Sequence, residues 1–476
     1  MKNKMITSRD EDFAKWYTDI VREAHLATYS ETKGFTIFEP NGYEIWENIQ
    51  NILDKKFKEL GHKNVYMPLL IPESLLLKEA EHVEGFAPEA AWVTIGGKKE
   101  LEERMCIRPT SETLFCSYFR DVLKSHKDLP IKLNQWCSVV RWEKETRPFL
   151  RTREFLWQEG HTIHKTEEEA KKETLDMLNV YKDLYENYLA IPVIVGKKTE
   201  KEKFAGAEYT LTLEALMYNG ITLQSATSHY FGNKFSKPFE VKYLDENNKL
   251  EYPYQTSWGI TTRTIGGLIM VHSDDNGLVL PPKIASRKVV IIPIGKDENV
   301  INKAKEINEE LNKNKITSFV DDTEKSPGFK FAEHEVNGIP IRIEIGNRDI
   351  ENDKFIVTRR DDSSKEEILL SKKELWADEI NKIMEKMQID MYNRAKKRME
   401  EKTYICYNFE ELEKTINTTP GFIKAMWCGD IECENKIKDV LGVKSRCIPF
   451  VEEKISDTCV CCGKEAKHMV YWGKQY

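Results

Sequence analysis

Charged and aromatic side chains are concentrated between Ile131 and His164, in a stretch that reads IKLNQWCSVVRWEKETRPFLRTREFLWQEGHTIH. With a period of two, Ile131–Glu143 is predicted to be a strand on which Arg141 and Glu143 share one face. A polar loop at 144–148 leads to a second strand, which begins near Thr152 and places five side chains on one face: Arg153, Phe155, Trp157, Glu159 and His161. Because buried charges need partners, this antiparallel hairpin suits a site for a small zwitterion beside a nucleotide better than an ordinary core. A solvated hairpin with incidental aromatic side chains is the alternative.

Two further stretches combine polar side chains in a similar way. In RPTSE (108–112), a strand would place Thr110 and Glu112 on one face, where both can accept a hydrogen bond from an ammonium group. In SWGITTR (257–263), the predicted common face carries Ser257, Gly259, Thr261 and Arg263. Glycine in such a strand allows a helix or a ligand to approach closely. Taken alone, either stretch is more simply a turn followed by a strand.

The chain has ten cysteines, and seven of them lie between Cys406 and Cys462. The start of the chain, MKNKMITSRDEDF, carries charges where a signal peptide needs an apolar segment, so we expect a cytoplasmic protein with thiols or metal ligands rather than disulfides. The spacings C-x4-C and C-x2-C place four thiolates in two close pairs: Cys428 with Cys433, and Cys459 with Cys462. Such pairs suit tetrahedral zinc in a structural role. Cys461 is a competing ligand, and free reduced cysteines are the alternative.

Three regions of different composition must position these residues. A chain of 476 residues is long enough for several cores, and 40% hydrophobic with 32% charged residues is typical of packed domains. No stretch of 18 or more apolar residues occurs, so we expect no membrane span. The net charge of −7 excludes a wholly basic nucleic-acid coat but allows local basic patches.

The first region, residues 1–285, is rich in aromatic residues and ends near the pair Pro281–Pro282. It contains a predicted amphipathic helix, Tyr43–Leu60, and a short strand, Val65–Met67, before Pro68. The second region, 286–400, alternates strands with helices and is predicted to be an α/β unit, with strands at 289–294, 316–320, 339–345 and 355–358. The third region, 401–476, holds the cysteine cluster.

Together and in this order, these stretches resemble a known family. The hairpin resembles the second signature motif of class II aminoacyl-tRNA synthetases, and GITTRTIGGLIMVHSDDNGLVLPP (259–282) resembles the third. The segment that ends at Pro68 looks like the first motif, which forms the dimer interface in that class. Within the class, RPTSE, FLRTREFLWQEGH and QSATSH (224–229) are similar to prolyl-tRNA synthetases. The resemblance implies an α+β fold with an antiparallel-sheet catalytic domain, an α/β anticodon-binding domain and the small C-terminal zinc domain of the archaeal and eukaryote-like branch.

The resemblance also implies an activity and roles for individual residues. The chain would be a homodimeric ligase that activates L-proline with ATP to prolyl-adenylate and transfers it to the 3′ end of proline tRNA, releasing AMP and pyrophosphate. Arg141 would bridge the proline carboxylate and the α-phosphate, and Arg263 would lie near the γ-phosphate. The implied proline site comprises Thr110, Glu112, Arg141, Trp157, Glu159, His161, His229 and Ser257. The implied ATP site comprises Arg141, Glu143, Arg151, Thr152, Phe155, Gln224, Thr227, Thr261 and Arg263. Mg²⁺ would bridge phosphates, and Zn²⁺ would be held by Cys428, Cys433, Cys459 and Cys462.

Further expectations follow from the same comparison. Gln224 and Thr227 have opposite parity, so a bulge or a strand end is needed to aim both into one site. Only roughly 90 positions separate His164 from Ser257, so we expect no editing domain between them. Glu344 and Arg348 are of the right types to read anticodon bases, although ordinary surface charges explain them equally well. The family suggests that the terminal carboxylate of Tyr476 approaches the active site.

Three alternatives to a proline enzyme are open. One is a synthetase of the same subclass for threonine or serine, which the order RPTSE, WQEGH, TSH disfavours. Another is a synthetase-like RNA-binding protein that has lost aminoacylation activity. The presence of both motif arginines, Arg141 and Arg263, weighs against it. A zinc- and RNA-binding structural protein is the third, and the large pocket-forming first region weighs against it.

Overall fold

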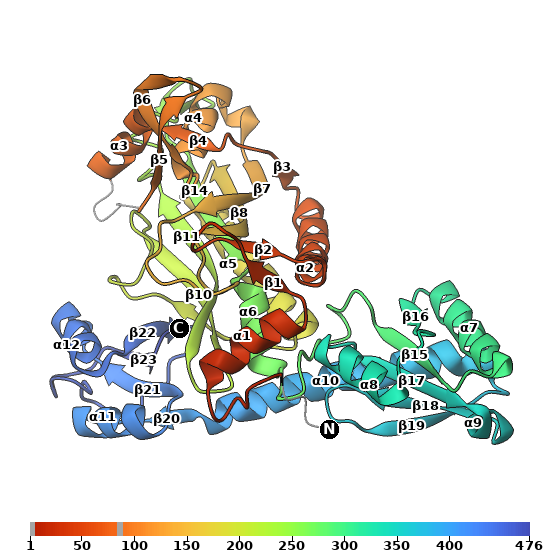
Figure 1. Ribbon diagram of the computed structural model, residues 1–476. Helices are drawn as coiled ribbons and strands as arrows, with labels where there is room; N and C mark the ends of the chain where they lie inside the picture. The colour runs from red at the N-terminus through yellow and green to blue at the C-terminus, as the bar shows by residue number, and fades with distance from the viewer. Residues whose placement is uncertain (1–4, 83–88) are drawn as a thin grey trace.

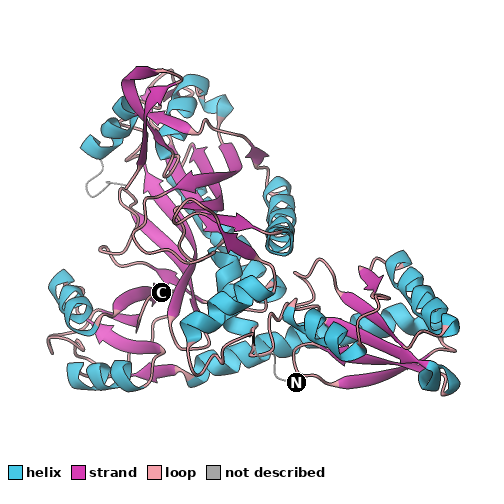
Figure 2. Cartoon of the chain, viewed as in Figure 1, coloured by secondary structure: helices cyan, strands magenta, loops and turns pink. Residues whose placement is uncertain are grey.

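The structure, a computed structural model, describes residues 5–82 and 89–476 and has an α+β fold (Figures 1 and 2). Residues 1–4, part of the segment on which the expected lack of a signal peptide rests, lie outside the described residues. Figure 1 shows an upper body built by the first region, with the second region at the lower right and the third at the lower left. The long helix α10 (Trp376–Glu401) runs along the base between the two lower parts. Within the described ranges, no helix combines the length and apolarity that a bilayer crossing needs.

A large, mostly antiparallel sheet forms the centre of the first region. Its strands run in the spatial order β9-β10-β11-β14-β8-β7-β3, with β3 (Lys63–Asn64) paired in parallel to β7 at the edge. The others are β7 (Ile131–Val140), β8 (Glu154–His164), β9 (Ile194–Lys197), β10 (Tyr209–Leu216), β11 (Thr222–Gly232) and β14 (Tyr254–Thr261). Helix α5 (Glu167–Asp183) packs against β8, β10, β11 and β14, and α6 (Arg263–His272) packs against β11 and β14. The helices seal one face of the sheet with the main hydrophobic core and leave the other face for a site.

Smaller elements surround this sheet. The amino-terminal part contributes α1 (Phe13–Glu23), β1 (Ala27–Tyr29), β2 (Thr36–Phe38) and α2 (Pro40–Glu59). Helix α2 is the predicted helix, but it begins three residues earlier because Pro40 suits the first turn, where its missing N–H has no intrahelical partner. A three-stranded sheet of β4 (Leu70–Pro72), β5 (Ala91–Gly96) and β6 (Lys99–Ile107) lies with α3 (Glu73–His82) and α4 (Glu112–Val122) at the top of Figure 1. A small hairpin joins β12 (Tyr243–Leu244) to β13 (Leu250–Glu251).

Four local predictions in the first region are wrong. Strand β7 ends at Val140, so Arg141 and Glu143 lie in the loop of the hairpin. RPTSE is not a strand: Pro109 interrupts strand hydrogen bonding, and Glu112 begins helix α4. Residues 65–67 are not a strand either, because the Met67 N–H is bound to the side chain of Gln135 rather than to a neighbouring strand. Arg263 is the first residue of α6 and not the last residue of the strand face.

The second region folds as the predicted α/β unit. Its five-stranded sheet has the order β16-β15-β17-β18-β19, in which β15, β16 and β17 are parallel. The strands are β15 (Val289–Ile294), β16 (Ser318–Val320), β17 (Ile341–Gly346), β18 (Lys354–Arg359) and β19 (Lys365–Leu369). Helices α7 (Glu298–Lys313), α8 (Pro327–Val336), α9 (Asn347–Glu351) and α10 complete it. The run at 289–294 is β-branched except for Pro293, and it is buried from Val289 to Pro293, as expected of a central parallel strand.

The third region extends the central sheet. Strands β20 (Thr403–Ile405), β21 (Phe422–Trp427), β22 (Lys444–Pro449) and β23 (His468–Gly473) join it through antiparallel pairing of β22 with β9, which gives eleven strands in all. Helices α11 (Phe409–Thr418) and α12 (Ile431–Leu441) flank these strands. The junction requires glycine at position 196, because a Cβ there would lie 2.4 Å from the carbonyl oxygen of Ile448.

Candidate active site

A pocket of about 300 Å³ opens on the face of the central sheet that the helices leave uncovered. Strands β8, β11 and β14, the hairpin loop and the start of α4 supply its walls. Its lining includes every residue that the sequence predicted for proline or ATP: Thr110, Glu112, Arg141, Glu143, Arg151, Thr152, Phe155, Trp157, Glu159, His161, Gln224, Thr227, His229, Ser257, Thr261 and Arg263. Residues from four distant stretches of the sequence therefore meet in one cavity.

A buried carboxylate network occupies one end of the pocket. Glu159 accepts hydrogen bonds from Ser111 Oγ at 2.5 Å and Gln135 Nε2 at 2.6 Å, and its other oxygen lies 2.8 Å from His161 Nε2. Burial opposes ionisation, but the contacts with His161, Ser111 and Gln135 together hold the pKa of Glu159 below its ordinary value. Glu112 is also buried and accepts a hydrogen bond from Thr110. This end of the pocket is therefore anionic and suits a small cation.

His229 stands beside this network as a neutral imidazole. Its Nδ1 lies 2.9 Å from Thr210 Oγ1 and its Nε2 lies 3.1 Å from Thr227 Oγ1, so both ring nitrogens have hydroxyl partners. Burial, with a further contribution from His161, lowers the pKa of His229 to about 3. Phe204 packs on the ring, with centroids 4.8 Å apart. His229 therefore serves as an uncharged wall rather than as an acid or a base.

Three guanidinium groups also line the pocket, and Arg141 lies between the carboxylates of Glu112 and Glu159 and the other two, Arg151 and Arg263. Arg141 Nε donates to the carbonyl oxygen of Pro109 at 3.0 Å, and Arg263 Nε donates to that of Leu150 at 3.2 Å. Burial and then the positive charges of Arg151 and Arg141 lower the pKa of Arg263 to about 10, so it stays charged at neutral pH. Three cations held close together are stabilised by a polyanion, and planar guanidinium groups suit phosphate and carboxylate.

A bulge on β11 allows Gln224 and Thr227, which would lie on opposite faces of a regular strand, to face the same side. Ala226 pairs with Leu213, but the next pair is Gln224 with Glu214, which leaves Ser225 as an extra residue. The extra residue changes the phase of the side chains, so Gln224 and Thr227 both line the pocket. The predicted bulge is confirmed.

The thiols of Cys428, Cys433, Cys459 and Cys462 converge in the third region. Their sulfur atoms all lie within 4.8 Å of one another, with 3.7 Å from Cys428 to Cys433 and 3.8 Å from Cys462 to Cys428. A tetrahedron of four sulfurs around zinc, with bonds of about 2.3 Å, has edges of about 3.8 Å. The donors thus fit a tetrahedral ion, and Cys462 rather than Cys461 completes the set.

Comparison with known proteins gives the family. The description "tRNA synthetase class II core domain (G, H, P, S and T)" matches residues 92–272, "Anticodon binding domain" matches 288–379, and "Prolyl-tRNA synthetase, C-terminal" matches 409–476. The "Proline--tRNA ligase" of Clostridium novyi is 58% identical over 472 residues, which cover 99% of this chain and 98% of the relative. The "Proline--tRNA ligase 2" of Bacillus cereus and the "Proline--tRNA ligase" of Lachnoclostridium phytofermentans are each 57% identical over the same coverage. This chain belongs to the prolyl-tRNA synthetases. The expected class II fold and ligase class are confirmed.

Several lining residues of this synthetase were missed in the sequence. They are Phe149, Leu150, Glu202, Phe204, Thr210 and Trp258. Phe149 and Leu150 belong to the hairpin loop, beside the predicted Arg151, so their position could have suggested them. Glu202 and Phe204 lie in an irregular loop, residues 199–207, where no period marks the side chains that face inward. Thr210 follows that loop at the start of β10 and acts through His229.

Proposed function

We propose that this synthetase joins L-proline to ATP as prolyl-adenylate and then transfers the prolyl group to the 3′ end of proline tRNA. The observation that carries the proposal is the charge arrangement of the pocket, in which Arg141 lies between the buried carboxylates and the guanidinium groups of Arg151 and Arg263. A prolinium ion placed between these carboxylates and Arg141 has its ammonium group toward Glu112 and Glu159 and its carboxylate toward Arg141. The triphosphate then lies among Arg141, Arg151 and Arg263.

In this arrangement no side chain needs to act as a nucleophile. Arg141 would hold the proline carboxylate and the α-phosphate together and neutralise the charge that develops as they join. Arg263 would hold the leaving pyrophosphate, and Phe155 would stack on adenine. When bound, Mg²⁺ would shield the phosphate charges. Trp157, His161, His229 and Ser257 would enclose the pyrrolidine ring, while Glu143, Thr152, Gln224, Thr227 and Thr261 would complete the nucleotide site.

The neutral state of His229 supports its assignment to the proline ring. A protonated imidazole would repel the prolinium nitrogen, whereas the lowered pKa keeps the ring uncharged across the physiological range. The pocket has no means of rejecting alanine strongly, because missing methylene groups change binding by only about 1–3 kcal/mol. Between His164 and Tyr254 the chain forms α5, β9–β11 and the β12–β13 hairpin, and we propose that the chain has no editing activity.

Zinc is proposed for the four-cysteine cluster, as in the archaeal and eukaryote-like branch. The sulfur separations suit the ion, and four thiolates leave no position for a catalytic water. The metal would fix α12, which carries Cys433, against the turn that carries Cys459 and Cys462. Metal analysis of the purified chain should give one zinc per chain.

Further proposals concern the partners and the domains. Exposed apolar side chains near the first motif, Tyr29, Ile37, Tyr43, Tyr66 and Leu69, support a homodimer through that face. The anticodon of proline tRNA is assigned to the 286–400 domain, between the catalytic domain at 1–285 and the zinc domain at 401–476. Within it, Arg348 is better placed for a base contact than Glu344, which already contacts Arg342 and Thr358.

The terminal residue lies close to the nucleotide end of the site. The Tyr476 N–H donates to the carbonyl oxygen of Thr222 at 3.1 Å, and the Arg147 guanidinium lies 5.5 Å from the centre of the Tyr476 ring. Burial raises the pKa of the phenol, and the positive charges of Arg147, Arg151 and Arg263 oppose that shift. These contacts support the prediction that the chain terminus approaches the active site.

Substitution separates the proposed roles. Arg141→Lys keeps the charge but loses the planar fork, so proline-dependent exchange of pyrophosphate into ATP should fall at least about a hundredfold, as when an oriented transition-state donor is removed. The same exchange with Arg22→Lys, whose guanidinium contacts Asp19 and Glu23 on α1, away from the pocket lining, should change little. Equal losses for both variants would contradict the assignment of Arg141.

A further inference from the structure

The loop at residues 199–207, which we call the pocket loop, is held by side chains of the third region. It carries Glu202 and Phe204 into the lining of the pocket, next to His229. Its first half has only local backbone hydrogen bonds, from the N–H groups of Glu202 and Lys203 to the carbonyl oxygen of Thr199, whereas its second half is held by the Phe204 N–H, which donates to Thr210 Oγ1 at 2.9 Å, and by packing of Phe204 and Ala207. The first half of the loop, which carries Glu202, therefore depends on outside contacts for its position.

Side chains of α12 provide the first set of outside contacts. Thr199 Oγ1 donates to Glu434 Oε1 at 2.8 Å, and Lys201 Nζ donates to Asn435 Oδ1 at 2.5 Å. Ser445 Oγ also donates to Glu434 Oε1, so the buried carboxylate joins the loop to both α12 and β22. The two links from the loop to α12 join residues more than 230 positions apart in the sequence.

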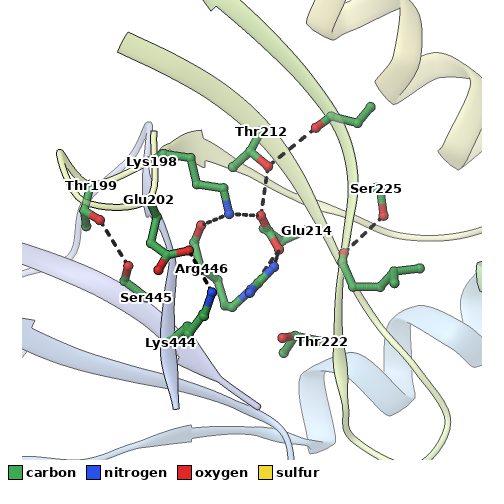
Figure 3. Close-up of polar contacts among 12 residues, drawn as sticks. Lys198, Thr199, Glu202, Thr212, Glu214, Thr222, Ser225, Lys444, Ser445 and Arg446 are labelled. Atoms are coloured by element: carbon green, nitrogen blue, oxygen red, sulfur yellow. Dashed lines mark hydrogen bonds and ion pairs between the residues drawn. The ribbon is translucent and has the colours of Figure 1, made fainter. Parts of the chain in front are cut away.

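Strand β22 supplies the second set of contacts, and Figure 3 shows its residues Lys444, Ser445 and Arg446 beside Glu202, Thr199 and Lys198. Lys444 Nζ lies 3.4 Å from Glu202 Oε2, so a cation of the third region pairs with a carboxylate that lines the pocket. At the foot of the loop, Lys198 Nζ contacts Glu214 at 2.6 Å and donates to the carbonyl oxygen of Arg446 at 2.8 Å. The third region thus fixes the loop at its base and through its first half, residues 199–202.

We infer that Glu434, Asn435 and Lys444 are positioning residues for the proline end of the active site, acting through the pocket loop. This inference rests on the proposed function. Glu434 and Asn435 directly follow Cys433 in α12, so the four-cysteine cluster and the loop anchors share one helix. Fixing Cys433 to a metal fixes the anchors, and the occupancy of the cluster is coupled to the shape of the proline pocket.

The test uses the full-length double variant Asn435→Ala/Lys444→Ala, whose two side chains are partly exposed and whose loss should leave the fold intact. We expect hydrogen exchange of the amides at 199–208 to accelerate at least about tenfold, since the lost contacts involve charged groups. The KM for proline should rise about tenfold, while the KM for ATP stays within twofold. The single variant Lys444→Arg keeps the positive charge and should behave as the wild type. The matched control is Glu432→Gln, because Glu432 is an exposed residue of α12, the helix that carries Asn435.

A second experiment removes metal from the wild-type protein with a chelator and measures hydrogen exchange of the same amides, at 199–208. Acceleration at 199–208 supports the coupling of the cluster to the loop, and unchanged exchange there overturns it. Unchanged exchange and KM in the double variant overturn the positioning role, as does an equal rise in the KM for proline and ATP. If the wild type shows no proline-dependent exchange of pyrophosphate, the proposed function fails, and the amide exchange still decides whether these residues hold the loop.

Discussion

The buried charges at the junction of β9, β10 and β22 give a prediction that can be worked out from the contacts. Glu214 is fully buried and accepts from Lys198 Nζ at 2.6 Å, from Arg446 Nε at 2.9 Å and Nη2 at 2.6 Å, and from Thr212 Oγ1 at 2.8 Å. Burial opposes its ionisation, but Arg446 and Lys198 outweigh that effect and hold the pKa of Glu214 below its ordinary value. The three ionised groups lie together with almost no exposure to water.

The perturbation is Glu214→Gln, which keeps the shape and removes the charge. Lys198 and Arg446 are then buried without a countercharge. Removing one partner of a buried ion pair lowers the free energy of unfolding by about 3–5 kcal/mol. For a cooperative unit of some 150–250 residues, each kcal/mol shifts Tm by about 2–4 °C, so the Tm should fall by at least about 6 °C. Differential scanning calorimetry measures this shift directly.

Two further variants make the result interpretable. Glu200→Gln removes an exposed carboxylate of the pocket loop that pairs with Lys203, and it should change stability by less than about 0.5 kcal/mol. Adding Lys198→Met to Glu214→Gln removes one uncompensated cation and should restore part of the lost stability. A Glu214→Gln protein as stable as the wild type, or a double variant less stable than Glu214→Gln, would refute the reasoning.

Other predictions follow from burial and close contacts. Loss of solvation lowers the pKa of two buried imidazoles, His164 to about 4 and His229 to about 3, and of the partly buried His272 to about 3. The unfolded chain binds protons at these imidazoles and the folded chain does not, so the free energy of unfolding falls as the pH drops below about 6.5, by up to about 1.4 kcal/mol per pH unit for each histidine. Urea unfolding between pH 7 and pH 5 measures this slope. The variant His272→Gln should lower the slope by the contribution of one histidine. Gly196→Ala should loosen the third region from the central sheet, because its Cβ would meet the Ile448 carbonyl oxygen at 2.4 Å; faster amide exchange in β22 reports this, and normal exchange would contradict it. Cys462→Ser should abolish stoichiometric zinc while Cys461→Ser retains it, and the reverse pattern in metal analysis would show that the fourth ligand is misassigned.

The sequence predicts the site better than the local structure that carries it. The resemblance of the motifs to class II synthetases, rather than periodicity, selected Arg141, Glu159 and Ser257, and the structure brings these three residues together in one pocket. The two-residue period wrongly predicted strands at Glu112 and Arg263. Both residues begin helices, and their side chains line the pocket from those positions. The bulge at Ser225 was predictable because two required residues had incompatible phases.

Contacts between distant segments could not be predicted in this way. The pocket loop has no period, and its partners, Glu434, Asn435 and Lys444, are ordinary polar residues in an amphipathic helix and a strand. Their importance comes from the pairing of β22 with β9, which nothing in either short segment specifies alone. The inclusion of Cys462 in the four-sulfur cluster likewise depends on the conformation of the turn at 459–463, which the spacing of the cysteines alone does not specify.

The measurement that tests the central claim most directly is exchange of pyrophosphate into ATP with each of the twenty standard amino acids, using full-length protein with Mg²⁺. The account predicts a strong signal with proline and much weaker signals with alanine and cysteine, and it predicts that Arg141→Lys loses the proline signal. A strong signal with another amino acid, or no signal from folded protein with any of the twenty, would contradict the assignment of this pocket to proline activation.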